Sequence, residues 1–464
     1  MDSDITDGEL AAFDRLVGRL RALPADDPAR LRAEQVAFSF ARDGRRGRRR
    51  IRGEQRAAAD AAVTSATATG AADRREDAPL DAGAVPARPA GTLARPRRCY
   101  ICKGRYRQVD AFYHLLCPDC ATENRSRRAL STDLSGRRAL LTGGRVKIGF
   151  QLALMMLRDG AELVVTTRFP QDTLRRFRSV DDSPEWLGRL TVAAIDLRDP
   201  RQVLGLCEQL RDAGEPLDIL INNAAQTVRR PPGSYALLAA GEHGPLPAGV
   251  LRAPGYTPAL ERHSVPNALA LVLPDTGETG LLPGLDEAGL LPGVDEAGLL
   301  PDPAPVNSWS ARIGELDPVE VLETQLVNAL APALLCDRLL PLLLASPRPR
   351  RYIVNVTAVE GRFAVRNKTG GHPHTNMAKA ALNMLTRTSG PELASQGVHM
   401  SAVDTGWITD ENPVPTKERI AAGGFRTPLD IVDGAARVYD PIVRGEAGAP
   451  VSGVFLKDYR EAAW

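Results

Sequence analysis

Residues Arg138-Ala-Leu-Leu-Thr-Gly-Gly-Arg-Val-Lys-Ile-Gly149 decide the fold. The apolar run before Thr142 predicts a short buried strand, the glycine pair predicts a tight turn, and a helix is expected to begin near Gly149. In such a unit, backbone N–H groups at the helix start can approach a phosphate closely. Glycine turns also join strands and helices in proteins that bind no nucleotide, so this stretch alone does not establish that a nucleotide binds here.

Further stretches follow in an order typical of an α/β fold. The segment Glu162–Arg168 has the apolar centre of a buried strand. The other stretches are Val192–Leu197, Leu217–Ala225, Val327–Pro332, Arg351–Gly361 and Val403–Thr409. Together they resemble the landmarks of the short-chain dehydrogenase/reductase family, over roughly residues 134–229 and 318–464. The resemblance implies an α/β, Rossmann-like, doubly wound parallel sheet over residues 134–464.

The resemblance also implies which residues bind a nicotinamide dinucleotide. The matching stretches depart from the family pattern at several positions: Lys147 replaces the middle glycine of the turn, and Ala225 replaces the glycine of Asn-Asn-Ala-Gly. Asp404 stands near an expected proline, and Asp196 is at a position that commonly contacts the adenine. The implied cofactor-binding residues are Thr142, Gly143, Gly144, Arg145, Lys147, Ile148, Gly149, Arg168, Asp196, Leu197, Asn223, Ala224, Lys379, Gly406, Ile408 and Thr409.

The choice between NAD and NADP depends on the end of the second strand, where this fold contacts the adenosine ribose. An acidic residue there would favour NAD, but Thr167 and Arg168 occupy the position, and Arg145 lies in the glycine turn. Two guanidinium groups suit a 2′-phosphate because arginine forms bidentate charge-assisted bonds to phosphate. We therefore expect NADP(H) and less readily NAD, with a solvated charge at the strand end as the alternative for Arg168.

The family's catalytic tetrad is only half present. Lys379 and Asn328 match it, whereas Thr375 stands where the tyrosine of Tyr-x-x-x-Lys belongs and Ala358 stands at the serine position. A threonine hydroxyl has too high a pKa to act as the general acid. Histidine titrates near neutrality and could take that role. The candidate catalytic residues are Asn328, Lys379, His374, His372, Thr375 and Thr357.

Each of these candidates also has a structural alternative. His372 and His374 could belong to a loop or cap held by Pro373, with Thr375 capping the helix. Thr357 replaces the missing serine only if the strand register shifts by one residue. Two functions follow: an oxidoreductase with an atypical site, transferring a hydride to or from a carbonyl or alcohol, or a catalytically inactive nucleotide-binding or scaffold protein.

Four cysteines predict a zinc site ahead of this domain. Cys99 and Cys102 are followed after fourteen residues by Cys117 and Cys120, a spacing that closes a tetrahedral thiolate site. A module of residues 98–130 is too small to fold on its own buried surface, which favours structural zinc. Disulfides and a redox-active Cys-x-x-Cys pair are the alternatives. The other two cysteines, Cys207 and Cys336, are expected to be buried thiols.

Residues 1–97 are expected to form an N-terminal arm of short helices followed by a disordered linker. Apolar spacing predicts one helix over 8–23 and another over 31–41, and residues 56–97 have the composition of a linker. The basic block 42–52 could contact nucleic acid or an acidic partner, but a solvated, flexible charge run is favoured.

About 100 residues separate Ala225 from Asn328, and they predict a long insert at about 229–317. A nine-residue near-repeat begins at Gly280, and its proline and glycine density predicts a flexible loop that folding does not need. A substrate-covering lid built from residues 229–275 stays open as an alternative.

Composition excludes several other classes of protein. The 464-residue chain has a formal net charge of +2, so nothing in its overall charge favours nucleic acid. Its beginning does not have the pattern of a signal peptide, and the apolar stretch 326–345 is broken by Asp337 and Arg338. We expect a cytoplasmic protein with a small-molecule substrate and no membrane association, forming a homo-oligomer through helices around 318–345 and 375–395.

Overall fold

The structure is a computed structural model that describes residues 5–83, 85, 88–258, 294–300, 304–365 and 368–464. Its centre is a nine-stranded sheet with the order β11-β10-β9-β8-β6-β3-β4-β5-β7. The strands are β3 (Arg138–Thr142), β4 (Glu162–Thr167), β5 (Leu190–Ala194), β6 (Ile219–Asn222), β7 (Leu251–Arg252), β8 (Arg351–Thr357), β9 (Val398–Asp404), β10 (Val454–Lys457) and β11 (Arg460–Ala462). All neighbours are parallel except β10 and β11.

The sheet is doubly wound about β3. The chain adds β4 and β5 on one side of β3 and then returns to place β6, β8, β9 and β10 on the other. In open sheets of this kind, ligands bind outside the carboxyl ends of the strands where the order reverses, here between β3 and β6. The Rossmann-like fold predicted from the sequence is confirmed.

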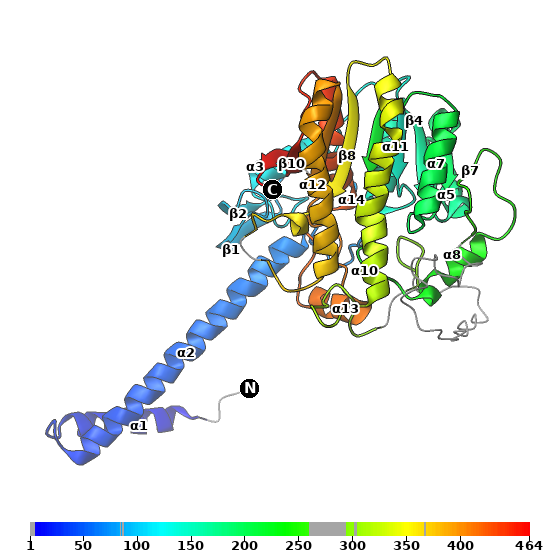
Figure 1. The fold of residues 1–464 in the computed structure, drawn as a ribbon. Coiled ribbons are helices and arrows are strands. Elements are labelled where there is room, and N and C mark those ends of the chain that lie inside the picture. The colour runs from blue at the N-terminus through cyan, green and yellow to red at the C-terminus, as the bar shows by residue number, and fades with distance from the viewer. Residues whose placement is uncertain (1–4, 84, 86–87, 259–293, 301–303, 366–367) are drawn as a thin grey trace.

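Helices cover both faces of the sheet, as Figure 1 shows. Alternate residues of β3 face opposite ways, so Leu140 joins one core while Ala139 and Leu141 join the other. The first core includes residues of α7 (Pro200–Asp212), α11 (Ala331–Ala345) and α12 (Pro373–Ser395). The second includes residues of α4 (Lys147–Arg158), α5 (Pro170–Arg178) and α14 (Ile431–Glu446). The remaining helices near the sheet are α6 (Ser183–Trp186), α8 (Ala236–Gly241), α10 (Pro318–Gln325) and α13 (Val414–Ala422).

The stretch Pro318–Ala345 is long and apolar enough to cross a membrane by length and composition alone. It lies against the sheet, however, where Leu335 and Leu339 are fully buried in the first core. Packing on the sheet makes it a core element.

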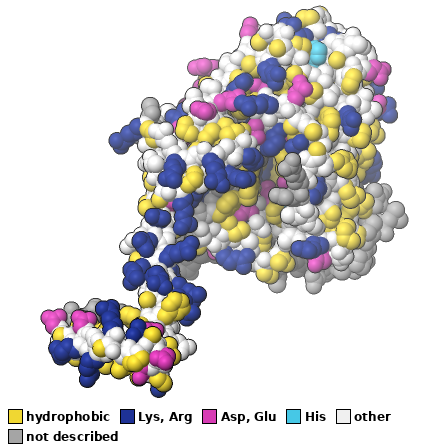
Figure 2. All heavy atoms as spheres, turned by 90° about the vertical axis from the view of Figure 1, so that its left-hand side faces the viewer, with side chains coloured by type: hydrophobic (Ala, Val, Ile, Leu, Met, Phe, Trp, Pro, Cys, Tyr) yellow, Lys and Arg dark blue, Asp and Glu magenta, His cyan; other side chains and the backbone are white. Residues whose placement is uncertain are grey.

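The N-terminal arm is more regular than the sequence predicted. Helix α1 (Asp7–Arg21) folds back on α2 (Pro28–Ser65), a single 38-residue helix that projects from the body of the molecule in Figure 1. Asp27 caps α2, and Asp60 is the one residue of α2 that is buried. Lys and Arg side chains are prominent along the projecting helix in Figure 2, and the basic block 42–52 is therefore helical.

The prediction of a disordered linker over 56–97 is corrected for the residues that the structure describes. The chain stays helical to Ser65, and the backbone N–H of Thr69 then bonds to Phe112 O at 2.9 Å. Arg74 donates to the carbonyl oxygens of Thr427 and Leu429, both at 2.7 Å. Composition suggested disorder because few large apolar residues are present; backbone and charged contacts order the segment instead.

The four-cysteine module contains β1 (Gly91–Arg98), β2 (Arg105–Val109) and α3 (Pro118–Arg127), so its first strand begins before residue 98. Its buried core includes Phe112 and Leu116 together with Ile408, Leu429 and Ile431 of the sheet domain. The module is therefore packed on the sheet domain through a shared core, and the two do not bury separate ones.

Candidate functional site

The glycine turn has the geometry that its sequence demands. Gly143 has a φ of +69°, and a Cβ on it would lie 2.9 Å from the Cα of Ala224. A Cβ on Gly149 would lie 2.2 Å from Gly143 O, so both positions require glycine. The Thr142 hydroxyl accepts the N–H groups of Asn223 at 2.9 Å and Ala224 at 3.0 Å, which ties the turn to the end of β6.

Lys147, in place of the middle glycine, has a left-handed backbone with a φ of 55°. Its ammonium lies 2.8 Å from Asp77 Oδ2, and the Thr409 hydroxyl donates to Asp77 Oδ1 at 2.6 Å. Although burial lowers the pKa of the Lys147 ammonium, the carboxylates of Glu411 and Asp77 outweigh it and raise that pKa to about 12. The structure thus brings Lys147 and Thr409 together around Asp77. No sequence signal marked Asp77, because it lies in the stretch taken for a linker.

Arg145 has partners within the chain. Its Nη1 lies 2.6 Å from Asp172 Oδ2 and donates to Ala297 O at 2.8 Å. The sequence predicted that the Arg145 guanidinium is free to bind a phosphate, and this prediction is wrong. Asp172 neutralises the guanidinium, and the turn at Asp295–Leu299 of the insert covers it. Arg168 lies over the rings of Phe169 and Tyr235, at 5.4 and 5.2 Å from the ring centroids.

The next strand end contains Asp196 and Leu197. Asp196 forms an ion pair with Arg198 at 2.6 Å. Burial opposes its ionisation, but Arg198, with Arg168 farther off, outweighs burial and holds the pKa of the Asp196 carboxyl below its usual value. The side chain of Leu197 is buried in the first core. Its side chain thus stabilises the fold, and only its backbone is left to contact a ligand.

Asn328 lies in a π turn, Leu326–Leu330, between α10 and α11. Its side-chain oxygen accepts the Gln226 N–H at 2.7 Å, and its amide donates to Gln226 O at 2.9 Å. This pair of bonds joins the helix to the segment that follows β6. Asn328 is 1% exposed, so its side chain has a fixed position.

Lys379 points toward the end of β8. Its ammonium donates to Val356 O at 2.9 Å. Burial lowers the pKa of Lys379 to about 8, against the smaller opposing effects of Glu360 and Asp404. The Thr357 hydroxyl donates to the carbonyl of Lys379 at 3.4 Å, so it faces α12. The extended Ala358 follows it.

The two histidines before Lys379 differ in their surroundings. His372 has a φ of 39°, its Nδ1 is 2.8 Å from Trp309 O, and its ring stacks on Trp309. His374 is 1% exposed, and among the described residues neither of its ring nitrogens has a hydrogen-bond partner. Burial lowers the pKa of His374, and the neighbouring His372 adds to the effect. The buried Thr375 hydroxyl also lacks a partner there, and the helix N-cap is His372, so Thr375 does not cap α12.

Comparisons with known proteins agree with this geometry. The family model for short chain dehydrogenases matches residues 137–236, and the model for enoyl-(acyl carrier protein) reductases matches residues 296–422. An uncharacterised protein of Acanthamoeba polyphaga mimivirus is 31% identical over 358 residues, which are 75% of this chain and 71% of that protein. The chain belongs to the short-chain dehydrogenase/reductase family. The two family matches leave a gap at 237–295, within the predicted insert.

Other similar proteins cover less of the chain or are more distant. The C-signal protein of Myxococcus xanthus is 30% identical over 126 residues, or 27% of this chain and 74% of that protein. A probable oxidoreductase of Streptomyces antibioticus is 37% identical over 92 residues, or 20% of this chain and 30% of that protein. Among solved structures, the carbonyl reductase Sniffer of D. melanogaster aligns with a TM-score of 0.44 and 18% identity, covering 71% of this chain and 100% of that one.

The four predicted zinc ligands come together in this family member. The sulfur atoms of Cys99, Cys102, Cys117 and Cys120 all lie within 4.8 Å of one another, and those of Cys102 and Cys117 are 3.7 Å apart. Tetrahedral zinc with Zn–S bonds of about 2.3 Å places its sulfurs about 3.8 Å apart, so this donor set fits zinc. All six cysteines are free thiols, which argues against the disulfide alternative, and Cys207 and Cys336 are buried as expected.

The four-cysteine module also contacts the stretch Val403–Thr409, which contains three of the cofactor residues that the resemblance implies. Tyr100, between two of the cysteines, accepts the Trp407 N–H on its hydroxyl at 2.9 Å. The predicted cofactor residue Ile408 has its side chain in the module's core, so only its backbone is left to contact a cofactor. Gly406 has a φ of +84° and would bring a Cβ to 2.6 Å from Leu429. No local sequence pattern predicts this contact.

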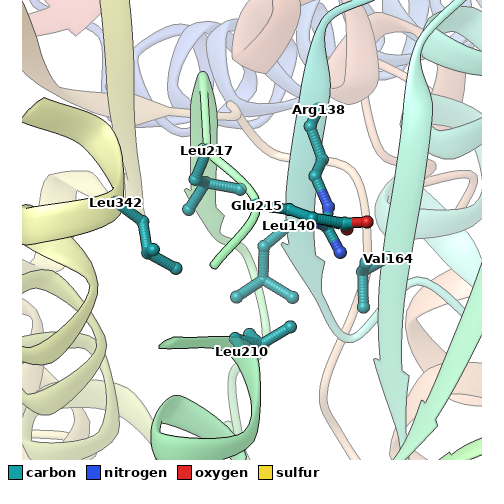
Figure 3. A pocket seen from close by; sticks show the side chains of 7 residues that line it. All are labelled: Arg138, Leu140, Val164, Leu210, Glu215, Leu217 and Leu342. Carbon is teal, nitrogen blue, oxygen red and sulfur yellow. Dashed lines mark ion pairs between the residues drawn. The ribbon is translucent and has the colours of Figure 1, made fainter. Parts of the chain in front are cut away.

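A small void lies at the opposite end of the sheet. Figure 3 shows its lining residues around the start of β3: Arg138, Leu140, Val164, Leu210, Glu215, Leu217 and Leu342. The void measures about 10 Å³, room for about one water molecule. It lies by the amino ends of the strands and is too small for a substrate, so it has no part in the site.

Proposed function

We propose that this chain is an NADP(H)-dependent oxidoreductase that transfers a hydride to or from a carbonyl or alcohol substrate through an atypical active site. Two observations carry the proposal: the buried Lys379 is bonded at the end of β8, and the fixed Asn328 is bonded to the segment after β6. Both strands end at the sheet edge that also carries the glycine turn. Both residues match the family's catalytic positions, and Gly143 and Gly149 lie where a diphosphate needs close backbone approach.

The residues present fit a nicotinamide cofactor. Lys379 would hold the nicotinamide ribose, and Thr142, Gly143 and Gly149 would form the diphosphate cradle. Bound NADPH supplies the hydride. Burial lowers the pKa of Lys379 to about 8, so its side chain is still mostly protonated near neutrality and can donate a hydrogen bond to a hydroxyl.

The proton comes from a group other than the missing tyrosine, and His374 is the first candidate. Its two ring nitrogens are buried without a partner among the described residues, whereas His372 is already engaged by Trp309. A buried polar group without a partner is costly, and such groups are found at functional sites. The buried Thr375 hydroxyl lies next to it in sequence and would orient the substrate oxygen.

Preference for NADP(H) is part of the proposal, and Arg168 is the residue that supports it. Asp172 neutralises Arg145, so Arg168 is left as the guanidinium at that strand end, held by aromatic rings. The substitution Arg168→Asp should weaken NADPH binding more than NADH binding. Equal affinities of the wild type for the two cofactors would contradict the preference.

Fluorescence titration with NADPH, followed by turnover assays on a panel of aldehydes and ketones, tests the function. Lys379→Ala should weaken NADPH binding. His374→Ala should abolish turnover and leave NADPH affinity unchanged, whereas the matched control His372→Ala should keep activity. Full turnover by His374→Ala would refute the histidine mechanism.

The second candidate function is an inactive nucleotide-binding or scaffold protein that acts through its four-cysteine module and basic arm. Ala358 and Thr375, in place of the family's serine and tyrosine, favour it. Tight NADPH binding by the wild type without turnover on any carbonyl would select this function.

We also propose a cytoplasmic homo-oligomer. Leu330 at the N-cap of α11, Leu344 in α11, and Met377 and Met384 in α12 are each more than 40% exposed in the single chain. Large apolar side chains gathered on neighbouring helices mark an interface. Light scattering of the purified protein should give a mass above that of one chain, and Met384→Lys should reduce it.

A further inference from the structure

Asp77 connects two elements that the family uses for its cofactor. Its Oδ2 lies 2.8 Å from the ammonium of Lys147, in the glycine turn. Its Oδ1 accepts the hydroxyl hydrogen of Thr409 at 2.6 Å, in the loop after β9. A carboxylate that accepts bonds from both elements makes the interactions that a phosphate oxygen would make between them.

The backbone on both sides of this ion pair is strained. Asp77 has a φ of 64° and Lys147 a φ of 55°, and neither residue is glycine. Left-handed conformations of this kind cost free energy and persist where the surrounding structure enforces them. Because Asp77 and Lys147 both adopt a left-handed backbone, the packing around them must hold their ion pair in place.

The segment that carries Asp77 is fixed on both sides. Arg74 donates to the carbonyl oxygens of Thr427 and Leu429, each at 2.7 Å. The N–H of Leu80 donates to Asp430 Oδ2 at 2.8 Å. These anchors keep Asp77 over the glycine turn, and the Asp77 side chain is only 9% exposed.

The charges around Lys147 oppose a second anion. The carboxylates of Glu411, Asp77 and Asp295 all act on its ammonium. Glu411 and Asp77 are the two largest of these carboxylate influences, and Lys417 also acts on Asp77, so the three carboxylates already outnumber these two lysines. A dinucleotide diphosphate brings about two further negative charges to the same turn, and like charges at this range repel strongly.

We propose that Asp77 occupies the diphosphate position of the cofactor site and sets its affinity: the carboxylate binds Lys147 and Thr409 in the free chain, and the cofactor must displace it. The inference rests on the proposed function, since it needs a dinucleotide as the competing ligand. It identifies the N-terminal segment around Asp77 as part of the cofactor site, where the family resemblance placed none.

The test compares NADPH affinities of the full-length wild type, Asp77→Asn and the control Asp73→Asn. Asparagine keeps the shape and tolerates the left-handed backbone while removing the charge. Asp73 lies on the same segment but is exposed, so its substitution changes the net charge equally without touching Lys147. Asp77→Asn should bind NADPH roughly tenfold more tightly or better, because one like charge is removed at close range; Asp73→Asn should match the wild type.

Hydrogen exchange of residues 72–80 gives a second, independent measurement. Adding NADPH to the wild type should speed exchange in this segment, because displaced Asp77 no longer holds it. Unchanged or weaker NADPH binding by Asp77→Asn would overturn the inference. Slower exchange of residues 72–80 on adding NADPH would also overturn it, because the segment would then be stabilised by the cofactor. No NADPH binding by any of the three proteins would refute the proposed function and this inference with it.

Discussion

Replacing Arg128 by methionine tests how the four-cysteine module is held on the sheet domain. Arg128 follows α3, and its Nη1 lies 2.5 Å from Asp430 Oδ1 and 3.1 Å from Asp433 Oδ1. The Arg128 side chain is 6% exposed and the two carboxylates are 0% exposed. Methionine keeps most of the apolar part of the arginine side chain and removes its charge. The substitution therefore measures the loss of the ion pairs with little change in packing.

The expected loss is large because the carboxylates stay buried. Breaking a buried ion pair by removing one partner costs about 3–5 kcal/mol. The guanidinium of Arg437, which also acts on Asp433, leaves part of the charge compensated, so we expect a loss of about 3 kcal/mol in the free energy of unfolding.

The loss should also depend on pH. Burial opposes ionisation of Asp430, but Arg128 outweighs it and holds the pKa of that carboxyl below its usual value. A depressed carboxyl pKa adds stability above the unfolded value of about 3.9 and loses it as the pH falls. The difference between wild type and Arg128→Met should therefore shrink as the pH falls below about 4.

Urea denaturation followed by tryptophan fluorescence and circular dichroism measures this loss. The matched control is Arg460→Met, which removes an ion pair between the sheet domain and Glu123 of the module at 2.9 Å. Arg460 is 66% exposed, so its loss should cost less than about 1 kcal/mol. Equal, small losses in the two variants would show that the buried pairs do not hold the module.

The other predictions concern the zinc site, the catalytic lysine and the insert. Chelation, or Cys117→Ser, should lower the melting temperature of the whole chain because the module shares its core with the sheet domain; two widely separated calorimetric transitions would contradict this. Between pH 8 and pH 10.5 the folded wild type binds fewer protons than the unfolded chain, so its free energy of unfolding should rise by up to about 3 kcal/mol. Lys379→Met should lack this rise, and identical pH profiles of the two proteins would refute the low pKa of Lys379. Leu299→Ala should cost about 2–3 kcal/mol in unfolding free energy; wild-type stability in urea would show that the insert does not pack.

Composition alone did not predict that part of the insert packs against the sheet domain. The sequence predicted that the repeat beginning at Gly280 is a flexible loop that folding does not need, and most of the repeat lies outside the described residues. The described part, 294–300, contradicts the prediction, because Ala297 and Leu299 are buried with Phe169 and Leu238. A glycine- and proline-rich repeat has no periodic apolar face, so the contact depends on where the sheet presents a complementary surface.

The local pattern of the sequence determined the sheet domain and the metal ligands. Apolar runs predicted buried strands, the family resemblance implied the doubly wound sheet, and any side chain at Gly143 or Gly149 would clash. The spacing of the four cysteines gave the ligand set for the same reason: a short chain separation forces the thiolates together. Asn328 and Lys379 were found because the short stretches that contain them resemble the family's catalytic stretches.

Only the tertiary structure decided which charges face one another. Asp77 binds Lys147 across 70 residues of chain, and Asp172 neutralises Arg145 from the following helix. No local pattern marks these pairs, since a surface charge and a buried ion-pair partner look alike in sequence. Burial decides between them: it makes an unpaired charge costly, so the fold selects the carboxylates that its arginines and lysines can reach.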